Sequence, residues 1–342
     1  MTASTPRSGA SGVPTLHDVA REAGVSLATA SRALNGSTRK VAEEYKVRVQ
    51  AAADRLGYTP NVAAQSTVRG SAPVIALLVA DIADPYFGLI ASGVARGADE
   101  HGLIVNIAIT ERDADRERKI IRSLRGQRPQ GLILAASRAA DDEATATELE
   151  AYARLGGRAV SFGRSVDGER VVQIDNRGGS RMLGEALAGH GYRRAVILAA
   201  PEGVRTSDDR IAGFTEGFTS GGGEVVRVHR HGFRREDGVT AMTEALEAGI
   251  EPGTVVFGMS DVVAIGAAAA IREAGREIGA DIALCGYDDV PAAVDVTPAL
   301  TTVHVPLSDI GYQAFRATVD DEWTPEELPL EVVLRASTPP VA

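Results

Sequence analysis

The chain has 342 residues, a formal net charge of −10 and a single cysteine, Cys285. A chain of this length is predicted to form two or three domains with enough core to fold without disulfides, and one cysteine cannot form an internal disulfide. No uninterrupted apolar run reaches the roughly 18 residues of a membrane helix, and residues 1–14 contain no apolar signal segment, so we expect a cytoplasmic protein with a disordered N-terminal tail.

The charge is distributed unevenly along the chain. Up to Arg69 the sequence has nine basic and five acidic residues, a balance of +4. The remainder has 27 basic and 41 acidic residues, a balance of −14. A basic N-terminal module on an acidic body indicates that the small part contacts a polyanion and the large part does not.

Residues 15–59 are predicted to form three helices. Thr15 is a good N-cap with Asp18 three residues later, and apolar residues then recur at helical spacing until Gly24. Ser26 caps a second helix almost at once, which is the helix-turn-helix arrangement. A third helix is expected from about residue 41 to residue 56, followed by Gly57.

The second helix has an outer face that is small, polar and cationic, with no acid. In a major groove its arginine could donate to guanine, its apolar side chains could contact thymine methyl groups, and its hydroxyl and amide groups could bind phosphate oxygens. The other interpretation is a helical subdomain whose arginine is merely solvated. The face consists of Leu27, Ala28, Ser31, Arg32 and Asn35.

The segment TLHDVAREAGVSLATASRALNG, followed by DRLGYTPN and AAQS, resembles the LacI/GalR family of bacterial transcription regulators. The similarity continues through DPYF, IDNRGG, RIAGF, GYDDV and TPALTTVHVPLSDIG. The resemblance implies a helix-turn-helix headpiece on a two-lobed core similar to periplasmic binding proteins. It implies that the headpiece binds DNA through Thr15, Ser26, Leu27, Ala28, Thr29, Ser31, Arg32, Asn35 and Tyr58.

Residues 60–72 are predicted to be a linker, because they are small and are followed by Pro73. The resemblance implies a hinge helix that pairs with its twin in the minor groove and inserts an apolar wedge between base pairs. It implies hinge contacts from Asn61, Ala64 and Gln65. The usual leucine wedge is replaced by Thr67, which is shorter and carries a hydroxyl group.

From residue 73 to residue 342 short apolar runs alternate with helical stretches, which predicts an α/β core of two doubly wound parallel sheets. We expect the first lobe to contain residues 73–170 and 303–319, and the second to contain residues 171–300 and 320–338. Ligands bind such sheets at the carboxyl ends of the strands, and two facing lobes create a cleft that can close around a small molecule.

Candidate ligand contacts follow these strands. Carboxylates and arginines beside aromatic rings suit a polyhydroxylated ligand. The candidates are Asp84, Tyr86, Phe87, Arg164, Thr206, Asp208, Arg210, Ser260, Asp261 and Asp288. By resemblance Tyr86, Phe87, Arg164, Arg210, Phe233 and Asp288 occupy effector-pocket positions, whereas Ser260 stands where many sugar-responsive relatives carry Asn.

Three of these candidates have a second, purely structural interpretation. Asp261 could cap the helix that follows it, Asp208 could be a solvated loop acid, and Arg210 could be an internal salt-bridge partner. The sequence alone leaves these alternatives open.

Enzyme signatures are missing. The first predicted strand is not followed by G-x-G-x-x-G, and the chain has no G-x-x-x-x-G-K-[ST], so no dinucleotide site or P-loop is predicted. His229 and His231 could begin a metal site but lack a further clustered ligand. We therefore expect no cofactor, no metal and no catalytic residues.

These observations predict a ligand-responsive repressor of carbohydrate-utilisation genes that acts as a homodimer on a pseudo-palindromic operator, because one recognition helix covers few base pairs. The effector is expected to be a sugar or sugar derivative that changes operator affinity by a population shift. The alternatives are a cytoplasmic sugar-binding protein without a DNA-reading role and a sugar-modifying enzyme. The C-terminal RASTPPVA contains no leucine heptad, so no tetramer-forming coiled coil is predicted.

Overall fold

A computed structural model describes residues 13–35, 41–59, 71–136, 143–163 and 170–341, with the side chain of Asn35 also left undescribed. The chain divides into two compact units, Met1–Ala72 and Pro73–Ala342. No helix in these described ranges is long and apolar enough to cross a membrane.

The first unit contains the helices α1 (Leu16–Ala23), α2 (Leu27–Asn35) and α3 (Glu43–Leu56). Thr15 forms the predicted capping box with Asp18, and Gly24 ends α1 in the left-handed conformation at φ 63°. Small apolar side chains from all three helices, among them Val19, Ala30 and Val49, form one buried core. The predicted helix-turn-helix is therefore confirmed.

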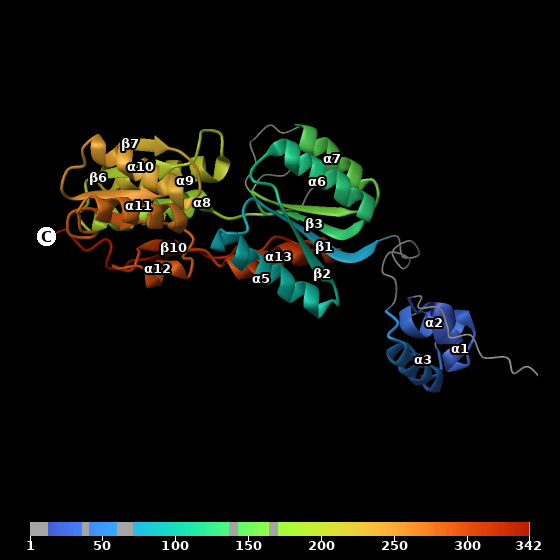
Figure 1. The fold of residues 1–342 in the computed structure, drawn as a ribbon. Coiled ribbons are helices and arrows are strands. Elements are labelled where there is room, and N and C mark those ends of the chain that lie inside the picture. The colour runs from blue at the N-terminus through green and yellow to red at the C-terminus, as the bar shows by residue number, and fades with distance from the viewer. Residues whose placement is uncertain (1–12, 36–40, 60–70, 137–142, 164–169, 342) are drawn as a thin grey trace, which may run out of the picture. The chain divides into compact units, whose positions relative to one another are not determined.

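The second unit begins with a five-stranded parallel sheet in the order β2-β1-β3-β4-β5 (Figure 1). Its strands are β1 (Ala72–Val79), β2 (Ile104–Ile109), β3 (Pro129–Leu134), β4 (Arg158–Phe162) and β5 (Arg170–Val172). The helices between them are α5 (Pro85–Glu100), α6 (Ala114–Gln127) and α7 (Glu143–Ala153). The central strands β1 and β3 are largely buried, as expected for a sheet covered on both faces.

A four-stranded sheet in the order β7-β6-β8-β9 forms the second lobe, and its strands are also parallel. The strands are β6 (Arg194–Ala199), β7 (Glu224–Arg230), β8 (Thr254–Gly258) and β9 (Ala283–Cys285). The helices are α8 (Asn176–Gly189), α9 (Arg205–Ser220), α10 (Arg235–Glu247) and α11 (Asp261–Glu273). Two parallel α/β sheets confirm the predicted fold class.

The last part of the chain crosses between the lobes. After α12 (Ala292–Asp295) and β10 (Thr302–His304), helix α13 (Leu307–Val319) packs against α5 and β3 of the first sheet. The chain then returns, β11 (Glu331–Val333) pairs antiparallel with β10, and the Leu284 N–H donates to the Ser337 carbonyl at 3.0 Å. Each lobe is thus completed by residues far away in the sequence.

The contact between α5 and α13 depends on glycine. A Cβ atom on Gly93 would lie 1.8 Å from the Ser308 carbonyl oxygen, and one on Gly311 would lie 2.1 Å from the Ile90 carbonyl oxygen. Both distances are far below any real contact, so the two backbones approach as closely as they do only because these positions lack a side chain.

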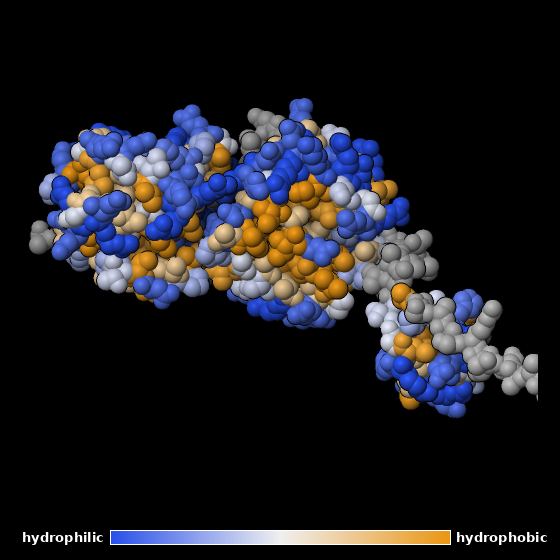
Figure 2. Space-filling model, in the orientation of Figure 1, coloured by the Kyte–Doolittle hydropathy of each residue, from blue (hydrophilic) through white to orange (hydrophobic). Residues whose placement is uncertain are grey.

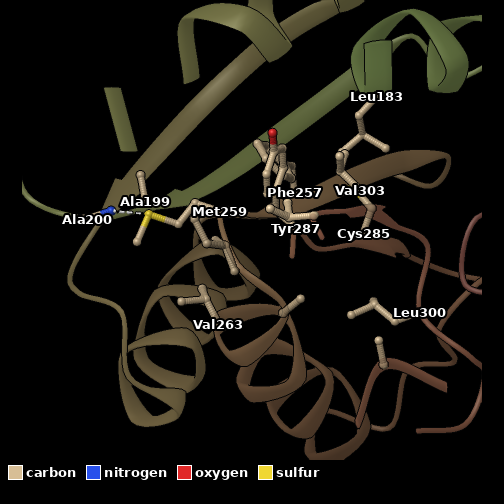
Figure 3. Packing of buried hydrophobic residues seen from close by; sticks show 14 of the residues in the cluster. Leu183, Ala199, Ala200, Phe257, Met259, Val263, Cys285, Tyr287, Leu300 and Val303 are labelled. Atoms are coloured by element: carbon tan, nitrogen blue, oxygen red, sulfur yellow. Dashed lines mark hydrogen bonds between the residues drawn. The ribbon is translucent and has the colours of Figure 1, made fainter. Parts of the chain in front are cut away.

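The core of the second lobe surrounds the end of β8. Phe214 stacks on Phe257 with ring centroids 4.7 Å apart. Figure 3 shows Met259 between Val263 and the Ala199–Ala200 end of β6, and the Ala200 N–H donates to its sulfur atom at 3.0 Å. This packing fixes the backbone where the strands end, which is where the predicted ligand contacts lie.

Candidate functional site

The outer face of α2 has the character that its sequence predicts. Leu27, Ala28 and Arg32 are exposed, whereas Ala30 is buried in the core. Arg32 forms no ion pair with the residues that the structure describes, and α2 itself contains no acid. The face is therefore a cationic surface that meets no counter-charge from the described part of the headpiece.

The other predicted headpiece residues also have structural roles. Ser26 Oγ accepts from the Thr29 N–H at 3.1 Å and lies 2.8 Å from Thr29 Oγ1, while Thr15 is occupied by its capping box. Tyr58 packs against the headpiece core, and Ser31 is half-buried. Asn61, Ala64, Gln65, Thr67 and Arg164 lie outside the described residues.

The second site is a cavity between the two lobes. It has about 580 Å³ of space, including its opening to solvent, which is within the usual size range of small-molecule sites. Because parallel strands end at the same edge of a sheet, both lobes contribute loop and helix-start residues here. Of the residues predicted from sequence, it brings together Asp84, Tyr86, Phe87, Thr206, Arg210, Phe233, Ser260 and Asp288.

A buried ion pair forms one wall of the cavity. Arg210 Nη2 donates to Asp288 Oδ1 at 2.7 Å, and the two side chains are only 3% and 4% exposed. Arg210 also donates from Nε to Asn176 Oδ1 at 2.8 Å and from Nη1 to the Met259 carbonyl at 2.6 Å, and its guanidinium lies 3.8 Å from the centre of the Tyr287 ring. Arg210 is thus an internal salt-bridge partner that also lines the cavity.

Burial controls the ionisation of Asp288. Desolvation raises the pKa of its carboxyl from 3.8 to about 6, although the neighbouring Arg210 opposes the shift. Asp288 also has φ 105°, an unusual conformation for a residue with a side chain. Its second carboxylate oxygen makes no hydrogen bond to the described residues, which leaves it able to accept one from a ligand.

Asp84 and Tyr86 form the opposite wall at the start of α5. Asp84 Oδ1 accepts from the Tyr86 N–H at 2.9 Å and so caps the helix. Burial raises the pKa of the Asp84 carboxyl and of the Tyr86 hydroxyl. Tyr86 meets the Phe87 ring edge-on with centroids 5.0 Å apart, which places an aromatic surface beside the carboxylate.

Two predicted contacts do not line the cavity. Asp261 is fully buried and accepts from Thr302 Oγ1 at 2.6 Å and from the Val290 N–H at 2.8 Å, so it connects α11 to the segment that crosses between lobes. Asp208 accepts from the Gly203 N–H at 3.0 Å and from Arg230 Nη1 at 3.2 Å. Both carboxylates have protein partners away from the ligand cavity.

The cavity also has lining residues that sequence reasoning missed: Arg112, Ala135, Phe162, Gly163, Ile174 and Asn176. Phe162 is the last residue of β4, and the others come shortly after β2, β3, β4 or β5, so applying the strand-end rule to β2, β3 and β5 as well, and to the residues next to Arg164 at the end of β4, would have found them.

The histidine pair of β7 has an acidic neighbour. His229 Nδ1 lies 3.3 Å and His231 Nε2 lies 2.9 Å from Glu244 Oε2 on α10. No group of three or more His, Cys, Asp or Glu side chains within the described ranges could hold a metal ion.

Two family models match the chain. The model "Bacterial regulatory proteins, lacI family" matches residues 15–61, and a periplasmic binding protein-like domain matches residues 185–338. The ribose operon repressor of Halalkalibacterium halodurans is 31% identical over 95% of this chain and 97% of its own length. The transcriptional regulator CelR of Thermobifida fusca is 32% identical over 90% and 91%, respectively.

Solved structures give the same result. The Lac repressor dimer bound to operator and the anti-inducer ONPF aligns with a TM-score of 0.82 and 26% identity, over 96% of this chain and all of that one. A CelR–cellobiose complex aligns with a TM-score of 0.68 and 29% identity, over 95% and 99%. The chain therefore belongs to the lacI family of bacterial regulatory proteins, and it is a ligand-responsive, DNA-binding transcription regulator rather than an enzyme.

Proposed function

We propose that this regulator is a homodimeric repressor of carbohydrate-utilisation genes whose operator affinity changes when a sugar or sugar derivative fills the cavity between its lobes. The observation that carries the proposal is the composition of that cavity. It combines carboxylates, guanidiniums, hydroxyl groups and aromatic rings from both lobes, and closure around a ligand would change how the lobes are held. Bacterial operator DNA lies in the cytoplasm, so the proposal places the protein there.

The DNA half of the proposal rests on α2. The exposed Arg32 is suited to donate to guanine O6 and N7, and Leu27 and Ala28 are suited to contact thymine methyl groups. The opposite charges of the two parts of the chain restrict DNA binding to the small basic part.

The proposal that the protein is a homodimer is supported by the edge of the first sheet. Strand β2 is an edge strand, and its Ile104 and Ile107 are 64% and 44% exposed. Figure 2 shows a broad hydrophobic area on the face of this lobe where β2 and α5 lie. An exposed apolar edge strand normally requires a partner, and the related Lac repressor was solved as a dimer on its operator.

The test is selection of genomic fragments by the purified protein, followed by sequencing of the bound DNA with and without sugars and nucleobases. A recovered palindrome whose yield changes with one sugar would support the proposal and give the sign of the effect. An Arg32→Ala variant should bind the site more weakly and accept more sequences at one base position per half-site, while Arg154→Ala, which removes an exposed arginine just after α7, should bind it as the wild type does. Failure to recover any site in every ligand condition would favour a sugar-binding protein without a DNA-reading role.

A further inference from the structure

One contact joins the two lobes directly across the cavity. Arg112 follows β2 in the first lobe, and Phe233 follows β7 in the second. The Arg112 Cζ atom lies 3.6 Å from the centre of the Phe233 ring, and both residues line the cavity. This distance is well inside the roughly 6 Å within which a guanidinium is attracted to an aromatic face.

The turn that carries Arg112 is held in an unusual conformation. Glu111 and Arg112 have φ 55° and 58°, so two consecutive residues with side chains adopt the left-handed region. The Glu111 N–H donates to the Ala80 carbonyl at 3.0 Å, and the Glu111 carboxylate accepts from Arg116 Nη1 at 2.9 Å. These bonds fix the turn from which the Arg112 side chain reaches Phe233.

Arg112 differs from the other arginine of the cavity in its hydrogen bonds. Arg210 uses three donor groups on protein acceptors. Arg112 makes no hydrogen bond or ion pair with any residue of the described ranges, where it interacts with the Phe233 ring face and, through its charge, with the nearby Asp84 carboxylate. Its N–H donors therefore remain available while its flat face covers the ring.

The charges of the cavity favour a neutral ligand over a charged one. Its lining contains two carboxylates, Asp84 and Asp288, and two guanidiniums, Arg112 and Arg210. An added anion would face both carboxylates, and an added cation would face both guanidiniums. A neutral polyhydroxylated ligand can donate to the carboxylates, accept from Arg112 and place its apolar C–H face on Phe233.

We propose that Arg112 and Phe233 form a latch that holds the two lobes together across the cavity, and that a neutral polyhydroxylated ligand displaces Arg112 from the ring when it binds. Arg112 is then a specificity-determining residue. A ligand must cover the Phe233 ring in place of Arg112 and must offer hydrogen-bond acceptors to the Arg112 guanidinium. The displacement step rests on the proposed function, whereas the latch itself does not.

The latch can be tested on the full chain without any ligand. Spin labels on Leu155→Cys in the first lobe and Glu247→Cys in the second report the distance between lobes by pulsed EPR, because both sites are exposed and the native Cys285 is buried. We expect Arg112→Ala and Phe233→Leu each to broaden the distribution and shift it to longer distances, and the double variant to add nothing further. Arg181→Ala, which removes an exposed arginine of α8, should leave it unchanged.

A second series separates the latch from ordinary packing. Mono-, di- and trifluorinated phenylalanine at position 233 keeps the shape of the ring but progressively weakens its negative face. We expect the distance distribution to broaden stepwise with fluorination, and this dependence to vanish in Arg112→Ala. If neither Arg112→Ala nor fluorination of Phe233 changes the distribution of distances between the two spin labels, the latch proposal is wrong.

D-ribose and cellobiose are the probes for displacement, with binding measured by calorimetry. When a sugar binds, the distance distribution should no longer depend on fluorination of Phe233. If a sugar binds and this dependence remains, the proposal that the ligand displaces Arg112 is wrong. If neither sugar binds and no operator is recovered, the proposed function fails, while the ligand-free distances still decide on the latch.

Discussion

The buried Arg210–Asp288 pair can be broken from either side, and the two breaks should have different consequences. In Asp288→Asn the guanidinium stays charged, because arginine cannot lose its proton at any relevant pH. With both side chains at most 4% exposed, removing the counter-charge should lower the free energy of unfolding by about 3–5 kcal/mol. The loss should be constant above about pH 7 and about 1.4 kcal/mol larger near pH 5, because protonation of the Asp288 carboxyl, whose pKa is raised, stabilises the wild-type native state there and the asparagine side chain cannot be protonated.

Arg210→Met leaves a carboxyl group that can neutralise itself. Burial already raises the pKa of Asp288 to about 6 in the presence of Arg210, and without that cation it should rise further. The native state then binds the Asp288 proton more tightly than the unfolded state, so stability decreases as the pH rises from the unfolded pKa to the native one. Each pH unit over that window costs about 1.4 kcal/mol, so the variant should be clearly less impaired near pH 5 than near pH 8.

Urea unfolding followed by fluorescence measures both variants, because the single tryptophan, Trp323, lies in the large unit. The control is Arg154→Ala, whose ion pair with Glu150 is 72% and 52% exposed and should contribute less than about 1 kcal/mol. Equal losses in Asp288→Asn and Arg210→Met, with the same pH dependence, would refute the reasoning.

Three further predictions concern DNA, ligand and packing. Arg32→Ala should cost about 1–3 kcal/mol and relax preference at one base position per half-site, as measured by binding to operator variants; equal weakening on every sequence would identify a phosphate contact instead. Sugar affinity measured by calorimetry should fall as the pH drops below about 6, because protonated Asp288 loses acceptor strength, and Asp288→Asn should remove this dependence; a flat wild-type profile would count against Asp288 as a ligand contact. Gly213→Ala should lower the free energy of unfolding by about 1–3 kcal/mol, since its Cβ would lie 2.0 Å from the Arg177 carbonyl oxygen, whereas Gly88→Ala, with open space around it, should not be destabilising in urea unfolding.

Features that depend on neighbouring residues could be predicted from the sequence. The Thr15 capping box and the glycine that ends α1 follow from chemistry within one helical turn, and both are present. The parallel sheets follow from the alternation of apolar runs and helices, and they bring most of the predicted strand-end side chains to one cavity.

Features that depend on distant partners could not be predicted in this way. Ser260 both caps α11, accepting from the Val263 N–H at 3.3 Å, and lines the cavity, while its neighbour Asp261 turns inward to Thr302. Which of these two adjacent polar side chains faces the cavity depends on β10, because its Thr302 binds Asp261 and holds it in the interior. Arg112 lies in the charged stretch ERDADRERK, where nothing local distinguishes it from its neighbours, and the left-handed turn that positions it depends on a bond to Ala80.

The close packing of α13 on α5 has a consequence for synthesis of the protein. The last strand of the first sheet ends at Val172, but the helix that covers α5 ends only at Val319, which is 147 residues later. At ribosomal rates of about 5–20 residues per second, this delay is roughly 7–30 s. During that time the second sheet can form. The face of α5 around Gly93 stays exposed until α13 has been synthesised and can complete the first lobe.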